Sequence, residues 1–153
     1  MNSIFMMKPQ SVRVVQADSK ADILATLSQT FAAAFDLDAG QVLEQLEERE
    51  SLGSTGFGRG VAIPHARMPH LKRPVAALLK LHRPVEFDAA DRLPVDLVFG
   101  LLSPANSGAT HLHALAAISR LVRDERVHDA LCDAPDSEAL YGVLTNATDR
   151  DAA

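Results

Sequence analysis

Residues 54–70 read STGFGRGVAIPHARMPH, and this stretch decides how the chain presents its most distinctive histidine. The run at 53–60 is too rich in glycine for the interior of a helix or strand, whereas the β-branched and apolar residues 61–63 predict a short buried strand. Pro64 ends that strand, because proline fixes its own backbone angle and biases the preceding residue toward an extended conformation. We therefore expect His65 to be held in a defined position at the edge of a sheet.

The chain before this stretch contains one predicted strand and two predicted helices. The strand is expected at 12–16. Ser19, with Asp22 three positions later, is typical of a helix start, and the first helix should run to about Phe35. Asp38 opens the second helix, which we expect to end near Leu52. The acidic residues of that helix should form its solvated side; they are Glu44, Glu47, Glu48 and Glu50.

The chain after this stretch continues with apolar strands and then helices. Strands are expected at 75–81 and 95–102, and the second should be central because it is apolar on both faces. Thr110 should cap a helix, and two short helices are expected at about 125–132 and 137–144. In the helix that begins at Thr110, five residues should share one face: Leu112, Leu115, Ala116, Ser119 and Val122. Helices before, between and after strands predict a single α/β domain with its sheet sandwiched by helices.

Composition limits the classes of partner and compartment. With 153 residues, 47% of them apolar, the chain can bury the core of one domain. Its net charge of −5, with acids and bases scattered, argues against a nucleic-acid partner. The one cysteine, Cys132, cannot form an internal disulfide, and no apolar run approaches the roughly 20 residues that span a bilayer. We therefore expect a cytoplasmic protein without membrane insertion.

His65 is one of six histidines, and the sequence places it in a defined setting. An imidazole nitrogen is a competent nucleophile toward phosphorus at neutral pH, because its ordinary pKa of about 6.5 leaves much of it unprotonated. The phosphoryl oxygens also need donors or cations. Arg49 is one candidate, and His111, in the first turn of the helix predicted after Thr110, is another. His113 would point roughly 200° away from His111 around that helix.

Other chemistries fit these residues less well. The glycine-rich run lacks the Gly-Lys-Ser/Thr ending of a nucleotide-binding loop, and it leads into a strand instead of a helix. A zinc hydrolase would use His65, His70, His111 and His113, but no His-Glu-x-x-His pair and no suitably spaced acid accompany them. A docking module that signals without phosphoryl transfer stays open, as does a structural role for any single histidine.

Three longer stretches are distinctive in combination: ERESLGSTGFGRGVAIPHA at 48–66, RPVEFDAADRLPVDLVFGLLSPA at 83–105, and THLHALA at 110–116. Together they resemble the mannitol/fructose-type enzyme IIA domains of the bacterial phosphoenolpyruvate-dependent phosphotransferase system, and most closely the nitrogen-regulatory members. The resemblance runs from about residue 11 to residue 144. It implies a mixed sheet flanked by helices, in a domain at 11–146 between an N-terminal lead-in at 1–10 and a frayed tail at 147–153.

The same resemblance implies a site and a partner. His65 stands where the family carries its phosphohistidine, while Arg49 and His111 match the other active-site residues; no cofactor or metal is implied. The implied donor is a histidine-containing phosphocarrier protein of the nitrogen-related system, itself charged from phosphoenolpyruvate by enzyme I. Two positions depart from the family pattern, Arg59 and Ala66. With Arg67, Lys72 and Arg73, Arg59 could change the charge of the docking surface, but we assign it no role.

The sequence also suggests how the phosphoryl group is used. No permease segment, enzyme IIB domain or carrier domain is fused to the chain, so we expect a switch that regulates effector proteins, not yet identified, through its phosphorylation state. Uptake of fructose- or mannitol-type sugars is the alternative within the family. A docking module that has lost phosphotransfer is the alternative of another class.

Overall fold

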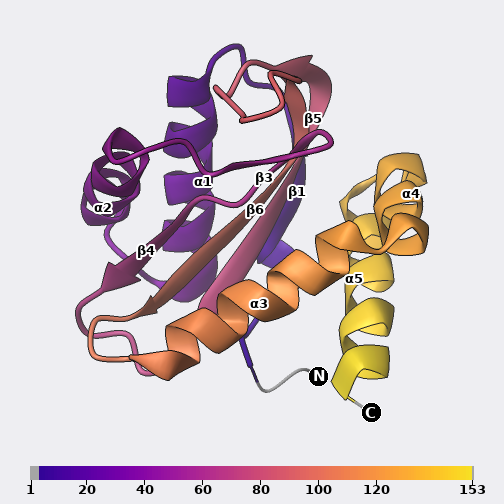
Figure 1. Cartoon of the computed structure of the whole chain (residues 1–153). Coiled ribbons are helices and arrows are strands. Elements are labelled where there is room, and N and C mark those ends of the chain that lie inside the picture. The colour runs from indigo at the N-terminus through magenta and orange to yellow at the C-terminus, as the bar shows by residue number, and fades with distance from the viewer. Residues whose placement is uncertain (1–3, 153) are drawn as a thin grey trace.

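The structure, a computed structural model, describes residues 4–152 and consists of a mixed sheet between two groups of helices (Figure 1). The six strands are ordered β1-β5-β6-β3-β2, and β4 also pairs with β6. Helices α1 and α2 cover one face, and α3, α4 and α5 lie on the other. The predicted α/β sandwich is therefore confirmed.

Strands β5 (Val75–Val85) and β6 (Val95–Pro104) form the centre of the sheet. They contribute side chains to the two hydrophobic cores, one on each face of the sheet. They pair in antiparallel fashion, with Leu78 opposite Phe99. Along β6, residues 97, 99 and 101 pack toward α3, α4 and α5, whereas residues 98 and 102 pack toward α1 and α2. Successive side chains of a strand point to opposite faces, so a strand with helices on both faces must be apolar throughout.

The N-terminal elements follow the prediction closely. A short 3-10 turn, Pro9–Ser11, leads into β1 (Val12–Val15), which pairs in parallel with β5. Helix α1 (Lys20–Phe35) begins after Ser19, whose hydroxyl accepts the Asp22 N–H at 3.1 Å. Helix α2 (Ala39–Ser51) begins after Asp38, whose carboxylate accepts the Gln41 N–H at 3.0 Å. Both caps satisfy backbone donors that have no partner within the helix.

The glycine-rich run was wrongly expected to lie outside any strand. Residues Gly56–Gly58 form β2, which pairs antiparallel with β3 (Val61–Ala62) across a turn at Arg59. Gly56 belongs in this strand because the chain passes close to Ala89: a Cβ at position 56 would lie 2.7 Å from the Ala89 Cα. Glycine here allows a close backbone approach instead of breaking the strand.

Pro64 interrupts a strand but does not end it. β3 and β4 (His65–Met68) both pair in parallel with β6, and they keep the same offset: Val61 faces Leu97, and His65 faces Leu101. Proline has no N–H to donate, so the strand pairing is interrupted at this residue. The pairing continues directly afterwards, because the Leu101 N–H donates to the Pro64 carbonyl. His65 therefore opens an edge strand, whereas the sequence placed it after a strand.

Helix α3 (Ala109–Arg123) differs from the prediction at its start and in its buried face. Gly108, with φ 51°, is the N-cap, so Thr110 lies within the first turn and is not the cap. The expected face is only partly buried, since Val122 is buried and Leu115 packs against the core, whereas Leu112 is 62% exposed. The buried residues are His111, Ala114, Ala117, Ile118, Leu121 and Val122. Leu112, Leu115 and Ala116 form a second apolar stripe beside the buried one, so the helical period alone did not single out the buried face.

Helices α4 (Glu125–Asp133) and α5 (Ser137–Ala152) complete the fold. The last helix runs into the segment 147–153 that the sequence assigns to a frayed tail; residue 153, like residues 1–3 of the lead-in, lies outside the described residues. Within the described part of the chain, no helix is both long enough and apolar enough to span a bilayer.

Candidate functional site

The structure brings the three site residues predicted from sequence to one cavity of about 260 Å³. Arg49 comes from the last turn of α2, His65 from the start of β4, and His111 from the first turn of α3. The imidazole centroids of His65 and His111 lie 5.7 Å apart. The cavity is lined by Gln45, Glu48, Arg49, Leu52, His65, Ala66, Arg67 and His111.

The orientation of His65 is set by a backbone carbonyl two residues earlier. Its Nδ1 lies 2.8 Å from the Ile63 oxygen. A carbonyl can only accept, so Nδ1 must carry the hydrogen, and in the neutral ring Nε2 then holds the free lone pair. Pro64, between the two residues, fixes the backbone that brings this carbonyl beside the ring. The half-buried imidazole thus has one defined tautomer.

The surroundings of His65 also keep it uncharged. Burial lowers the pKa of His65 most, and the Arg49 guanidinium lowers the pKa further. The hydrogen bond to Ile63 and the negative charge of Glu50 act in the opposite direction, but the net pKa of His65 lies below its ordinary value. Because a group with a lowered pKa loses its proton more readily, the imidazole is neutral and nucleophilic at pH 7.

His111 is more deeply buried, with 6% of the residue exposed. Its Nδ1 lies 2.7 Å from the hydroxyl oxygen of Ser103, which is itself fully buried on β6. Burial, and then the nearby His65 and Arg67, lower the pKa of His111 to about 4. When Ser103 donates to Nδ1, the neutral ring carries its hydrogen on Nε2 and can serve as a donor.

Arg49 is one of two arginines that line the cavity, the other being Arg67. Its guanidinium donates to the Gly53 carbonyl at 2.9 Å, which ties the end of α2 to the loop that precedes β2. This bond leaves other N–H groups of the guanidinium available, because arginine has five donors in a planar fork. Leu52, 81% exposed, also lines the cavity.

Three residues around the site were missed or misread from sequence. Glu50, expected on the solvated side of α2, is only 9% exposed. It follows Val42 and Leu46 at intervals of four, so the apolar stripe of α2 contained the signal that position 50 turns inward. Ser103 and Arg67 contact or line the site from β6 and β4; their place depends on strand pairing that no local pattern reveals.

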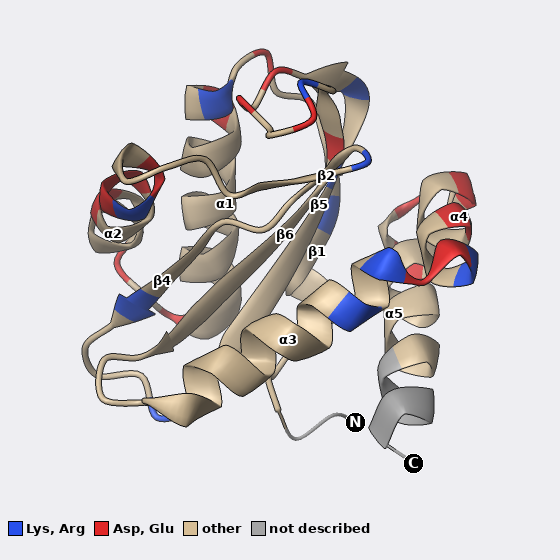
Figure 2. Cartoon of the chain, in the orientation of Figure 1, with Lys and Arg blue, Asp and Glu red and all other residues tan. Residues whose placement is uncertain are grey.

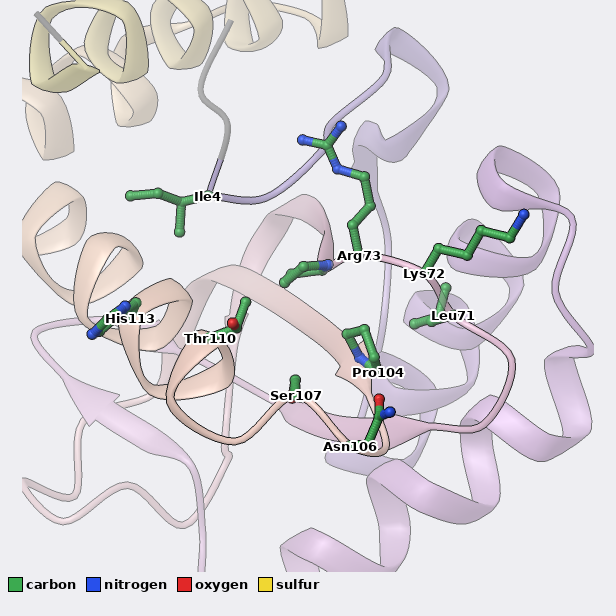
Figure 3. A pocket seen from close by; sticks show the side chains of 10 residues that line it. Ile4, Leu71, Lys72, Arg73, Pro104, Asn106, Ser107, Thr110 and His113 are labelled. Atoms are coloured by element: carbon green, nitrogen blue, oxygen red, sulfur yellow. The ribbon is translucent and has the colours of Figure 1, made fainter.

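The other two histidines of the zinc-hydrolase alternative, His70 and His113, do not line this cavity. His113 borders a second cavity, of about 630 Å³, on another side of α3 (Figure 3). Its lining residues are Ile4, Leu71, Lys72, Arg73, Pro74, Pro104, Asn106, Ser107, Thr110 and His113. Figure 3 shows His113 and Thr110 on the helix, with Lys72 and Arg73 extending from the facing loop. Across the described residues, no three His, Cys, Asp or Glu side chains gather as a metal site.

The basic residues that we grouped with the docking surface occupy separate places (Figure 2). Arg67 lines the cavity with His65, whereas Lys72 and Arg73 border the second cavity. Arg59 pairs with Glu125 of α4 at 3.4 Å, between side chains that are both exposed. An exposed pair of this kind contributes little to stability, and Arg59 is not among the residues that line the cavity.

Residues 5–147 match the family model described as phosphoenolpyruvate-dependent sugar phosphotransferase system, EIIA 2. A nitrogen regulatory protein of Bradyrhizobium diazoefficiens is 42% identical over 130 residues, which cover 85% of this chain and 85% of that protein.

Solved structures agree with this match. The nitrogen regulatory protein IIA-Ntr from Neisseria meningitidis superimposes with a TM-score of 0.82 at 32% identity, over 90% of this chain and 95% of that chain. The mannitol IIA structure from Escherichia coli has a TM-score of 0.74 at 17% identity, over 92% of this chain and 99% of that chain, and so shows a common fold.

Proposed function

The chain belongs to the EIIA 2 family of the phosphoenolpyruvate-dependent sugar phosphotransferase system, and on that basis we propose that it carries a phosphoryl group on Nε2 of His65. The observation that carries this proposal is the 2.8 Å contact between His65 Nδ1 and the Ile63 carbonyl. It leaves Nε2 as the nucleophilic nitrogen of a neutral ring, and the ring lines the cavity that Arg49 and His111 share.

The transfer proposed is an in-line exchange between two imidazoles. The Nε2 lone pair of His65 attacks phosphorus on a phosphohistidine of the donor; the new N–P bond forms as the donor's N–P bond breaks, and that electron pair returns to the donor's ring. No proton has to move, because Nδ1 of His65 keeps its hydrogen. The phosphorylated ring then carries positive charge, and the Ile63 carbonyl stabilises it through the same hydrogen bond.

Arg49 and His111 have separate roles in this proposal. The Arg49 guanidinium balances the charge on the phosphoryl oxygens and suits them by the geometry of its donors. His111, held neutral in the first turn of α3, donates from Nε2 without adding a second cation beside His65. Both groups are in place before transfer, so the site can stabilise the developing charge with little reorganisation.

The regulatory use of the phosphoryl group is supported by the relatives. The chain is similar to proteins named nitrogen regulatory protein, and we assign it the same kind of role, in the cytoplasm, with a histidine-containing phosphocarrier as donor. A phosphoryl group adds about two negative charges at one surface position. Such a charge can create or block the docking of an effector protein. The unit proposed to act in this way is the domain at 11–146.

Sugar uptake is the second candidate, because the matching family is described as part of a sugar phosphotransferase system. In that role the phosphoryl group of His65 would pass to an enzyme IIB. Rapid loss of label from phosphorylated protein to an enzyme IIB of the mannitol or fructose type would favour uptake, whereas label retained for hours in its presence would favour the regulatory role.

The site is tested by phosphorylation in vitro. The protein is incubated with ³²P-phosphoenolpyruvate, enzyme I and the phosphocarrier, and the label is assayed for acid lability and base stability. Wild type and His113→Ala should take up one equivalent, and His65→Ala none. Label on His65→Ala would move the site elsewhere, and an unlabelled wild type would favour a docking module without transfer.

A further inference from the structure

Glu50 is a buried carboxylate beside the site that the transfer itself does not use. It lies in the last turn of α2 next to Arg49, and its side chain is 5% exposed. A buried carboxylate stays charged only where donors or cations compensate for lost solvation. Glu50 has three such partners: the Lys20 ammonium at 3.0 Å, the Thr55 N–H at 3.1 Å and the Thr55 hydroxyl.

The contacts of Glu50 continue to the ring of His65 through two backbone carbonyls. Thr55, fixed by its N–H and its hydroxyl, accepts the Ile63 N–H on its own carbonyl at 2.9 Å. The Ile63 carbonyl in turn accepts the His65 Nδ1–H at 2.8 Å. Every residue in this series is buried or half-buried, so water cannot readily replace a lost contact.

The carboxylate also acts on the site through its charge. Glu50 raises the pKa of His65, whereas its neighbour Arg49 lowers it, so two adjacent residues of α2 have opposite electrostatic effects. The charged groups around Glu50 are Lys20, from α1, and Asp88, whose carboxylate lies 4.0 Å from the same ammonium. Lys20 also lies over the Phe87 ring at 4.7 Å, which fixes its position.

We infer that Glu50 is a positioning residue for phosphoryl transfer: through Thr55 and Ile63 it holds the carbonyl that keeps the hydrogen of His65 on Nδ1 and so leaves Nε2 free. This inference rests on the proposed function. A role in stability alone would be met equally well by an apolar residue of similar volume, since replacing a buried ion pair in that way is often neutral. A positioning role explains why this residue is charged, because the contacts of the Glu50 carboxylate continue without a break to the His65 ring.

The test compares Glu50→Gln with Glu47→Gln, an exposed glutamate of the same helix that does not line the cavity. In ¹⁵N-labelled protein, the chemical shifts of the His65 ring nitrogens report the tautomer and the pKa without any donor protein. Glu50→Gln should populate the Nε2–H tautomer and lower the pKa of His65, because it removes a negative charge. Its initial phosphorylation rate should fall roughly 10-fold, the size of effect seen when the partners that orient metal-binding histidines are removed. Glu47→Gln should match wild type.

Thr55 provides a second pair of variants in case Glu50→Gln does not fold. Thr55→Ser keeps the backbone N–H and the hydroxyl that donate to Glu50, and it should retain the wild-type tautomer and rate. Thr55→Val keeps the side-chain shape but loses the hydroxyl, so it should change the His65 tautomer and the phosphorylation rate in the same direction as Glu50→Gln. A folded Glu50→Gln or Thr55→Val with wild-type tautomer and a rate within twofold would overturn the inference. If wild type takes up no phosphate, the proposed function fails, and the ring shifts still decide whether Glu50 controls the tautomer.

Discussion

Two histidines share one small cavity; burial lowers the pKa of both, and a different contact orients each ring. His65 donates from Nδ1 to the Ile63 carbonyl, which leaves no choice of tautomer. His111 meets a hydroxyl, Ser103, which can donate or accept. Burial, together with the nearby His65 and Arg67, lowers the pKa of His111 to about 4, so at neutral pH this ring adds no positive charge beside His65.

The low pKa of His111 predicts a specific loss of stability in mild acid. Burial holds the folded pKa at about 4, below the ordinary unfolded value. A histidine with a lowered folded pKa is stabilising above its unfolded pKa, and that stability is lost as the pH falls from about 6.5 toward the folded value. Between pH 7 and pH 5 the loss should be about 2 kcal/mol.

Urea unfolding of wild type and His111→Asn at pH 7 and pH 5 measures this loss. Wild type should lose about 2 kcal/mol more than the variant over that range. The comparison removes the contribution of His65, which is present in both proteins. Equal losses in the two proteins would show that His111 titrates in the fold as it does in the unfolded chain.

At this scale the sequence was informative where the residue's chemistry is local. Pro64 and the strand before it indicated that His65 is held in place, and the family resemblance pointed to Arg49 and His111. Of the partners that tune these groups, Ser103 could not be predicted, because it reaches His111 through the packing of α3 on β6. The spacing from Val42 and Leu46 indicated that position 50 turns inward, but it did not reveal the contacts of Glu50 with Thr55 and Lys20, which depend on the tertiary fold.

At the scale of elements, the helix starts show what sequence patterns can and cannot specify. Ser19 and Asp38 cap α1 and α2 with their own side chains, and both starts were predicted because the capping contact spans three residues. Helix α3 starts after Gly108, which has no side chain to make such a contact. Its start is set by backbone geometry, since φ is 51° and ψ is −121° at this residue.

This geometry predicts opposite effects for two glycine-to-alanine changes. Nothing lies within 4 Å of a Cβ at either Gly108 or Gly142, so packing is the same in both cases. Gly108→Ala should destabilise the protein by about 1–3 kcal/mol, because L-residues are strained at its backbone angles. Gly142→Ala, inside helix α5, should stabilise it by about 0.5–1 kcal/mol, because alanine is the better helix former.

Thermal unfolding of the two variants against wild type provides the measurement, with the shift in Tm expected downward for position 108 and upward for position 142. Because His111 lies in the first turn after Gly108, Gly108→Ala should also perturb the ring signals of His111. A stabilised Gly108→Ala would mean that another N-cap geometry is available to α3.

At the scale of the whole molecule, two cores share one sheet, and the site lies where α2, β4 and α3 meet. The continuous apolar run at 95–102 predicted a central strand with both faces buried, and the structure confirms it for β6. β5, which was predicted as a strand from the alternation of its apolar residues, also has side chains in both cores. Which strands pair depends on contacts between distant segments. The continuation of β3 into β4 beside β6, past Pro64, was therefore beyond local patterns.

The N-terminal segment was expected to be a lead-in, but residues 5–7 take part in the fold. Met6 bridges to Val75, and its carbonyl accepts the Ala76 N–H at 2.9 Å. Phe5 is 1% exposed and packs edge-on against Phe99 of β6, with ring centroids 6.1 Å apart. This segment therefore closes the core beneath α3, α4 and α5.

Phe5→Ala should accordingly destabilise the whole domain by about 3 kcal/mol or more, because a fully buried aromatic ring leaves a cavity when it is truncated. Leu93→Ala, at a position 51% exposed, is the matched control and should change stability by less than about 0.5 kcal/mol. Urea unfolding followed by circular dichroism gives both values. If Phe5→Ala unfolds at the same urea concentration as wild type, the segment is docked on the domain without stabilising it. A large loss of stability in a single cooperative transition would show that the core, and with it the sheet that carries His65, depends on residues before the first strand.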